Sequence, residues 1–163
     1  MYYDDKKITT YEGIDDIKLG DTFENIVTIL KEHKIIFSTG IDKNKGCTQQ
    51  IEWKTIYIKK YMSLVFANNI LFQINFEEEF KGALDNGIKI GTLISVAQKM
   101  DTNLEYDDWN EVWQSNVGYW LFDTVEFKKV YTITIGIKEM LSDDEFYSYK
   151  WLSKYEKIKQ KQI

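Results

Sequence analysis

A short motif that occurs twice restricts the folds open to this chain. Residues 17–20 read Ile-Lys-Leu-Gly, and residues 88–91, which lie 71 positions later, read Ile-Lys-Ile-Gly. Each copy leads into apolar residues at the i, i+3, i+4, i+7 spacing of an amphipathic helix. The two stripes are Phe23, Ile26, Val27 and Leu30 in the first copy and Leu93, Val96, Ala97 and Met100 in the second. This pattern favours two copies of one strand–turn–helix unit over a chance match between common residues.

The turn between motif and helix carries capping residues in both copies. Gly20 permits a tight turn, and Asp21 with Glu24 three positions on predicts a capping box. In the second copy Thr92 is the predicted cap. Because the motifs align at an offset of 71 and the stripes at 70, we interpret Asp21 as a one-residue insertion at the turn.

Strand-like segments follow each helix. They are residues 51–58, 63–66 and 70–76 after the first helix, and residues 119–122, 125–127 and 130–137 after the second. Residues 38–49 read as a polar loop, and strand and helix do not keep alternating, which disfavours a parallel doubly wound sheet. The predicted fold class is therefore α+β: two tandem units, each a helix packed on an antiparallel β-meander, plus a C-terminal helix.

The predicted boundaries follow from these patterns. We place the first helix-plus-sheet unit at residues 13–80, the second at residues 86–139 and the C-terminal helix at residues 142–160, all within what could be one continuous domain. The C-terminal helix opens with a capping box, Ser142 to Glu145. Its apolar stripe is Phe146, Tyr149, Leu152 and Tyr155.

The charge of the chain argues against nucleic acid as a direct partner. Its net charge is −5 and all 21 of its basic residues are lysines, so it has no arginine to grip phosphate or guanine with two parallel hydrogen bonds. A basic protein is the more fitting partner. The N-terminal residues lack the apolar core of a signal peptide, and no apolar run reaches the roughly 20 residues that span a bilayer. These features indicate a cytoplasmic protein without a membrane partner.

Residues with catalytic or metal-binding potential are few and scattered. Cys47 is the single cysteine, which excludes a disulfide framework and a cysteine metal cluster. The single histidine, His33, ends the first predicted helix, where it suits the helix dipole better than it suits catalysis without a partner. The three glutamates at 77–79 are expected to be solvated, because neighbours along an extended chain point to opposite faces. No catalytic residue, metal site or cofactor is therefore predicted.

One segment differs in kind from the rest. Residues 105–113 combine four acids with three large aromatics, and another tryptophan and aspartate follow shortly after. Protein interfaces favour aromatic anchors inside a polar rim, and an acidic patch steers a basic partner. The predicted partner-binding residues are Glu105, Tyr106, Asp107, Asp108, Trp109, Glu111, Trp120 and Asp123. The competing interpretation is a short helix in which Trp109 and Trp113 pack into the core while the acids face water.

The second unit carries a family resemblance. Residues 87–92 read Gly-Ile-Lys-Ile-Gly-Thr, residues 104–107 Leu-Glu-Tyr-Asp and residues 118–121 Gly-Tyr-Trp-Leu, and an alternating strand ends at Glu139. With these segments the chain resembles small bacterial immunity proteins of polymorphic toxin or contact-dependent growth-inhibition systems. Its layout is similar to tandem helix-plus-sheet inhibitors such as the β-lactamase inhibitor protein. The resemblance covers about residues 13–139 and implies a non-enzymatic protein that binds a toxin domain and blocks it.

The leading hypothesis is an immunity protein for a cognate bacterial toxin. It would neutralise a toxin domain, with a basic nuclease as the favoured case, by occluding the active or substrate-binding surface. The first alternative is a non-enzymatic scaffold or adaptor of a cellular complex, which would not be encoded beside a toxin gene. The second is a small carboxylate-dependent hydrolase, which would need two acids that converge in one pocket.

Overall fold

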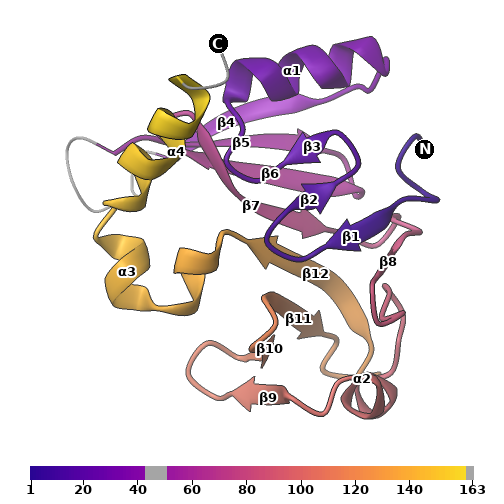
Figure 1. Ribbon diagram of the computed structural model, residues 1–163. Coiled ribbons are helices and arrows are strands. Elements are labelled where there is room, and N and C mark those ends of the chain that lie inside the picture. The colour runs from indigo at the N-terminus through magenta and orange to yellow at the C-terminus, as the bar shows by residue number, and fades with distance from the viewer. Residues whose placement is uncertain (43–50, 161–163) are drawn as a thin grey trace.

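A computed structural model describes residues 1–42 and 51–160 of the chain (Figure 1). Within these residues the protein is mixed α+β, with its strands in two sheets and with helices that include one at the C-terminal end. Cys47 lies outside the described residues, as do residues 43–49 of the predicted polar loop 38–49.

An antiparallel sheet of eight strands forms the centre of the structure, in the order β4-β5-β6-β7-β12-β11-β10-β9. Its strands are β4 (Ser38–Asp42), β5 (Trp53–Ile58), β6 (Met62–Ala67), β7 (Ile70–Phe76), β9 (Leu104–Asp107), β10 (Val112–Ser115), β11 (Tyr119–Asp123) and β12 (Val130–Gly136). Two four-stranded meanders lie side by side in this sheet. They join where β7 pairs with β12, with Ile133 opposite Phe76 and Ile135 opposite Ile74. The predicted first and second units therefore share one continuous sheet.

One face of this sheet is covered by a large hydrophobic core. Alternation along the strands places Ile74, Ile133 and Ile135 on that face, and all three are fully buried. Three further elements cover them. These are α1 (Phe23–Glu32), α2 (Ile94–Met100) and a small sheet of β1 (Lys7–Thr9), β2 (Gly13–Ile14), β3 (Ile17–Lys18) and β8 (Ala83–Leu84) in the order β3-β2-β1-β8.

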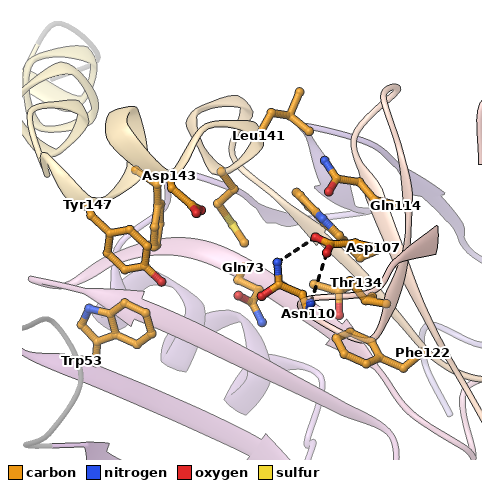
Figure 2. Close-up of a pocket in the computed structure, with 14 residues that line it drawn as sticks. Trp53, Gln73, Asp107, Asn110, Gln114, Phe122, Thr134, Leu141, Asp143 and Tyr147 are labelled. Atoms are coloured by element: carbon orange, nitrogen blue, oxygen red, sulfur yellow. Dashed lines mark hydrogen bonds between the residues drawn. The ribbon is translucent and has the colours of Figure 1, made fainter. Parts of the chain in front are cut away.

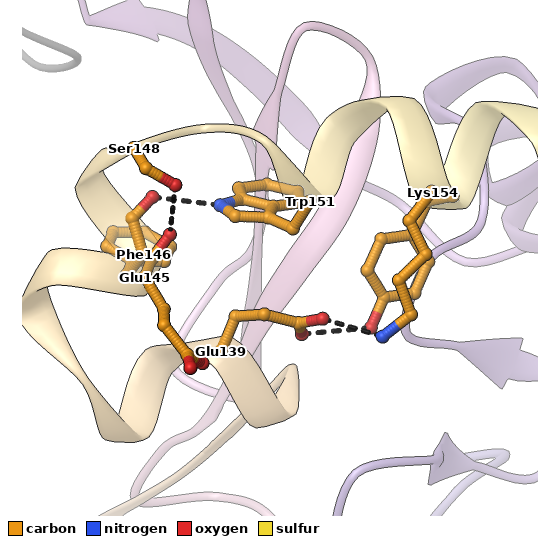
Figure 3. Close-up of polar contacts among 7 residues, drawn as sticks. Glu139, Glu145, Phe146, Ser148, Trp151 and Lys154 are labelled. Atoms are coloured by element: carbon orange, nitrogen blue, oxygen red, sulfur yellow. Dashed lines mark hydrogen bonds and ion pairs between the residues drawn. The ribbon is translucent and has the colours of Figure 1, made fainter.

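Among the described residues, the C-terminal segment covers one end of the opposite face. That segment comprises the 3₁₀ helix η1 (Lys138–Leu141), α3 (Asp143–Tyr147) and α4 (Trp151–Gln160). It forms a second core in which Phe72 of β7 contacts Phe146 and Trp151. Figure 3 shows how the segment holds its shape: Trp151 Nε1 donates to the Phe146 carbonyl oxygen at 2.9 Å, and Lys154 Nζ pairs with Glu139 Oε1 at 2.6 Å.

The predicted C-terminal helix exists but is interrupted. Tyr149 has a left-handed backbone with φ of +53°, which ends α3 and starts α4 in a new direction. Three of the four residues in the predicted stripe, Phe146, Tyr149 and Leu152, are nevertheless buried. The apolar pattern thus predicted burial correctly although the helix is not continuous.

The two motifs open their helices with the same set of backbone hydrogen bonds. Gly20 N donates to Leu71 O and Gly91 N donates to Val130 O, both at 2.7 Å, and the two glycines have φ of +86° and +87°. Helices α1 and α2 begin at Phe23 and Ile94, so the offset of 71 holds through both turns. The predicted insertion at Asp21 is therefore wrong.

The last strand of each meander also bulges at one aromatic residue. In β7 the register passes from Gln73 to Leu71 opposite consecutive residues of β6, which leaves Phe72 unpaired. In β12 the register passes from Thr132 to Val130 opposite β11, which leaves Tyr131 unpaired. A bulge turns an extra side chain toward one face, and Phe72 turns toward the second core.

The corrected offset changes which residues of α2 are buried. Ile94 and Ala97 face the core, whereas Leu93, Val96 and Met100 are at least 40% exposed, so the predicted second stripe is wrong except at Ala97. The first stripe is confirmed, with Ile26 and Leu30 fully buried and Phe23 and Val27 packed against the same core.

The predicted caps are each displaced by one residue. Thr22, not Asp21, caps α1 by accepting a hydrogen bond from Asn25 N. Leu93 occupies the cap position of α2 and its side chain accepts no hydrogen bond there, while Thr92 instead accepts from Lys89 N. A helix start read from sequence can therefore be off by one position when two polar residues adjoin.

Three local predictions differ from the observed structure. The predicted loop starting at residue 38 begins with strand β4, an edge strand beside β5. Residues 125–127 lie in a turn, not a strand, with Val125 and Phe127 88% and 60% exposed. Residues 104–115 form the β9–β10 hairpin, so the helical interpretation of the acidic segment is wrong, and only Trp113 of its two tryptophans packs on the core.

Candidate functional site

The open part of the second sheet face has a polar floor at its centre. Strand alternation brings Ser63, Gln73, Asn75 and Thr134 to this face from three neighbouring strands. Asn75 links them: its Oδ1 accepts from Gln73 Nε2 and Thr134 Oγ1, both at 2.8 Å, and its Nδ2 donates to Ser63 Oγ at 2.9 Å. A satisfied network of this kind fixes side-chain orientation on a surface that no other element of the described chain covers.

A hollow of about 420 Å³ lies between this floor, α3 and the β9–β10 hairpin (Figure 2). Its aromatic lining comes from β5, β11 and α3 and comprises Trp53, Trp120, Phe122, Phe146 and Tyr147. Two carboxylates also line it, Asp107 at the end of β9 and Asp143 at the start of α3, and Figure 2 shows them on opposite sides of the hollow. No lysine is among the described residues that line it.

Two further hollows continue from the same floor. One, of about 540 Å³, is lined by Lys60, Glu77, Glu78 and the bulged Tyr131, and the other, of about 230 Å³, is lined by Asp42, Thr55 and Tyr57. All three hollows share Gln73. Their charged lining in the described chain is five acids and one lysine, and Lys60 is paired with Glu78 at 2.9 Å. The open face is therefore an acidic surface that carries aromatic side chains.

Asp107 is held in place by its own hairpin. Its Oδ1 accepts from the backbone N–H groups of Trp109 and Asn110, and its Oδ2 accepts from Asn110 Nδ2 at 2.7 Å. These hydrogen bonds, the Asn110 side chain foremost, lower the pKa of Asp107 below its ordinary value. The carboxylate thus keeps its negative charge and its direction at neutral pH.

The structure places the eight predicted partner-binding residues on one hairpin and the strand next to it. Glu105, Tyr106 and Asp107 belong to β9, and Asp108, Trp109 and Glu111 form the tip of the β9–β10 hairpin. Trp120 and Asp123 belong to β11. Asp107 and Trp120 meet in the 420 Å³ hollow, while Glu105 lines a separate recess beside it with Asp107.

The remaining predicted residues surround that hollow or face away from it. Trp109 is 92% exposed at the hairpin tip, and Tyr106 turns to the covered face, where its ring lies 5.0 Å from that of Trp113. Asp123 is mostly buried and lies 3.9 Å from Lys128. Desolvation and then the negative charges of Glu111 and its acidic neighbours raise the pKa of Tyr106, which reflects how densely the acids are gathered here.

Sequence reasoning missed the contribution of the C-terminal segment. Asp143 and Tyr147 reach the hollow only because α3 folds back over the sheet, and no local pattern reports that contact. Gln73 and Asn75 could have been found, because they alternate with Ile74 and Phe76 in a strand that is otherwise apolar. A polar row in a central strand indicates a face that no core covers.

Other polar clusters in the described chain have structural roles. His33 ends α1 as predicted, and its Nε2 lies 2.6 Å from Asp16 Oδ2. The other oxygen of this carboxylate, Oδ1, accepts from Tyr3 Oη at 2.9 Å. This network ties the end of α1 to the β2–β3 turn. Residues 77–79 follow the end of β7; Glu78 and Glu79 are exposed as expected, whereas Glu77 is partly buried.

No group of three or more histidine, cysteine, aspartate or glutamate side chains is arranged to hold a metal ion in residues 1–42 and 51–160. None of the helices in that part of the chain has the length and apolar character needed to cross a membrane. Comparison of the chain with protein-family models, curated proteins and solved structures finds no match to any of them.

Proposed function

We propose that this protein is a non-enzymatic binding module that holds a basic protein on the open face of its eight-stranded sheet. The observation that carries the proposal is the composition of that face, where five acids and several aromatic side chains line three connected hollows. Aromatic side chains supply binding energy at protein interfaces, and acids supply steering and selectivity toward a basic partner. The net charge of −5 acts in the same direction over longer distances.

The partner proposed first is a cognate toxin domain, in keeping with the resemblance to bacterial immunity proteins. A nuclease domain needs a positively charged surface to bind its substrate, because phosphate neutralisation dominates nucleic-acid affinity. An acidic sheet face that covers such a surface would exclude the nucleic acid without any chemistry of its own. The localisation proposed with this role is cytoplasmic.

The exposed aromatic residues of the second meander support a partner on this side. The bulged Phe72 of the first meander is buried beneath α3 and α4, whereas the bulged Tyr131 of the second is 45% exposed. Val125, Phe127 and Trp109 on the neighbouring turns are also exposed. Exposed apolar side chains together with acids are the composition of a protein interface.

The test is binding to the product of the neighbouring toxin-like gene. Co-expression of this protein with the toxin should rescue the growth of the cells. Calorimetry should show a complex whose affinity falls as the salt concentration rises. Reversing two charges with Asp107→Lys and Asp108→Lys should weaken the complex at least tenfold, mainly by slowing association. Reversing Glu12 and Glu32 changes the net charge equally on exposed residues of the covered side and should leave affinity within about twofold.

Two results would defeat this proposal. If the neighbouring gene encodes no toxin and a basic protein partner is found in a cellular complex instead, the scaffold alternative replaces the immunity role. If both pairs of reversals weaken the complex equally, the open face is not the binding surface.

A hydrolase remains the weaker candidate, and one observation favours it: Asp107 and Asp143 share a hollow. A hydrolase with two carboxylates needs one of them protonated as a general acid, which requires a raised pKa. The pKa of Asp107 is lowered instead. Turnover of a glycoside or ester substrate that is lost in Asp143→Asn would establish this alternative.

We also propose that the chain consists of two tandem copies of one unit. Three correspondences support this. Gly20 N and Gly91 N each donate a backbone hydrogen bond of the same length, and the 71-residue offset between the motifs also separates the starts of α1 and α2. The last strand of each meander, β7 or β12, bulges at one aromatic residue. The unit boundaries of 13–80 and 86–139, with the C-terminal helix at 142–160, stay part of this proposal.

A further inference from the structure

The 420 Å³ hollow lies between the open sheet face, α3 and the β9–β10 hairpin, and its lining has a specific chemistry. Aromatic side chains form much of its wall, and the charged groups among its described lining residues are two carboxylates. The described chain supplies no lysine to this lining, so no described side chain offsets the charge of the two carboxylates. A cationic side chain of a partner would therefore complement the charge of this hollow.

The shape of the lining favours a flat organic cation over a compact one. The aromatic residues Trp120, Phe122 and Tyr147 line the hollow, and a guanidinium stacks on aromatic rings better than an ammonium does. Asp107 is oriented by its hairpin, and Gln73 donates its Nε2 to Asn75, which leaves its Oε1 as an acceptor. A guanidinium has five donors and no acceptor, so it matches a site whose available polar atoms are mostly oxygens.

We propose that this hollow is a socket for an arginine side chain of the protein partner. The guanidinium would lie between Asp107 and Asp143 and stack on the aromatic wall, with Gln73 on the floor below it. The inference rests on the proposed binding function, which it deepens by naming the anchor residue of the partner. The chain itself contains no arginine, so none of its own residues can occupy the socket in this way.

The experiment uses the free side chain, so that the socket is tested without the partner. Nα-acetyl-arginine methylamide is titrated into the ¹⁵N-labelled full-length protein, and chemical shifts are followed at the Trp120 indole and the backbone of β11. Saturable shifts confined to the hollow are expected. The citrulline analogue, which has the same shape without the charge, should bind at least tenfold more weakly, and the lysine analogue should bind more weakly than arginine.

Matched variants separate the socket from general electrostatics. Asp107→Asn with Asp143→Asn removes both carboxylates while keeping side-chain size, and should reduce arginine affinity at least tenfold. Glu12→Gln with Glu32→Gln removes the same charge from exposed residues that do not line the hollow, and should change affinity less than twofold. Near-UV circular dichroism of both pairs checks that the aromatic environment of the folded protein is kept.

Four outcomes would overturn the inference: no saturable shifts, equal binding of citrulline, equal binding of lysine, or equal losses in both variant pairs. Failure here and failure of the proposed function give different results. A basic partner that binds while the arginine probe does not would leave the function and remove the socket. Arginine binding without any basic partner would keep the socket and remove the function.

Discussion

Gly20 and Gly91 form a natural pair of sites for measuring what the C-terminal helix contributes. Both have left-handed backbones with φ near +86°, and both donate to the opposite strand at 2.7 Å. Their surroundings differ. A Cβ on Gly20 would lie 2.5 Å from the ring of Tyr155 in α4, whereas a Cβ on Gly91 would meet nothing within 4 Å. The same substitution therefore carries a steric penalty at one site only.

The expected magnitudes follow from this difference. Gly91→Ala should lower the free energy of unfolding by roughly 1–2 kcal/mol, the conformational cost of a left-handed alanine. Gly20→Ala should carry the same conformational cost and, in addition, a cost of roughly 1–3 kcal/mol for displacing the packed ring of Tyr155. The total loss in the free energy of unfolding is then about 2–5 kcal/mol. The displaced ring would also strain its edge contact with Trp151 and its hydrogen bond to Glu139.

Urea unfolding followed by tryptophan fluorescence measures both values, and a double-mutant cycle isolates the steric part. In a Tyr155→Ala background, Gly20→Ala should cost no more than Gly91→Ala costs in the native chain, because the obstructing ring is gone. Equal costs for the two single variants, or a cost of Gly20→Ala that persists without Tyr155, would refute the reasoning. Equal costs for the two single variants would mean that α4 moves away from residue 20 without loss of stability.

The other predictions concern the second half of the chain. Asp101 is 8% exposed, and hydrogen bonds from Ser115 and Tyr119 outweigh the desolvation that opposes them, so its pKa is lowered. Ionised Asp101 should make its full contribution to the free energy of unfolding above the ordinary aspartate pKa of about 4. That contribution should be lost as the pH falls through the lower pKa that Asp101 has in the folded protein. Asp101→Asn should flatten that acid decline in pH-dependent thermal melts, and an unchanged decline would contradict this cause. Leu93→Thr should give α2 the cap that Thr22 gives α1 and stabilise the protein by about 0.5–2 kcal/mol in urea melts. A loss of stability would argue against equivalence of the two turns.

Sequence patterns were reliable where a single local signal decided the structure. The stripe of α1, the turns at Gly20 and Gly91 and the strand at residues 70–76 all follow from spacing or from backbone freedom, and all are observed. The exposed second stripe shows the limit of this reasoning. Two sets of apolar residues, one starting at Leu93 and one at Ile94, fit the helical spacing of α2. The packing of the helix on the sheet decides that Ile94 is buried and Leu93 is exposed.

The candidate site could be predicted only in part, for a related reason. Asp107 and Trp120 were identified from composition because acids and aromatics gather in one stretch of sequence. Asp143 joins them from a segment more than twenty residues beyond Trp120, after the chain leaves β12 at Gly136 and passes through η1. Long-range contacts of this kind depend on how the completed sheet is covered, and no periodicity within α3 contains that information.

The pairing of β7 with β12 has a consequence for how this chain reaches its folded state. Each meander is continuous in sequence, but the strands that join them are separated in the chain by α2 and four other strands. Non-local pairing closes a long loop before it gains any contacts, so this seam should form late and set the folding rate. A chain divided between residues 77 and 83 would give two fragments, each with one exposed central edge. Those edges are complementary, so the two fragments should reassemble with each other in preference to folding alone.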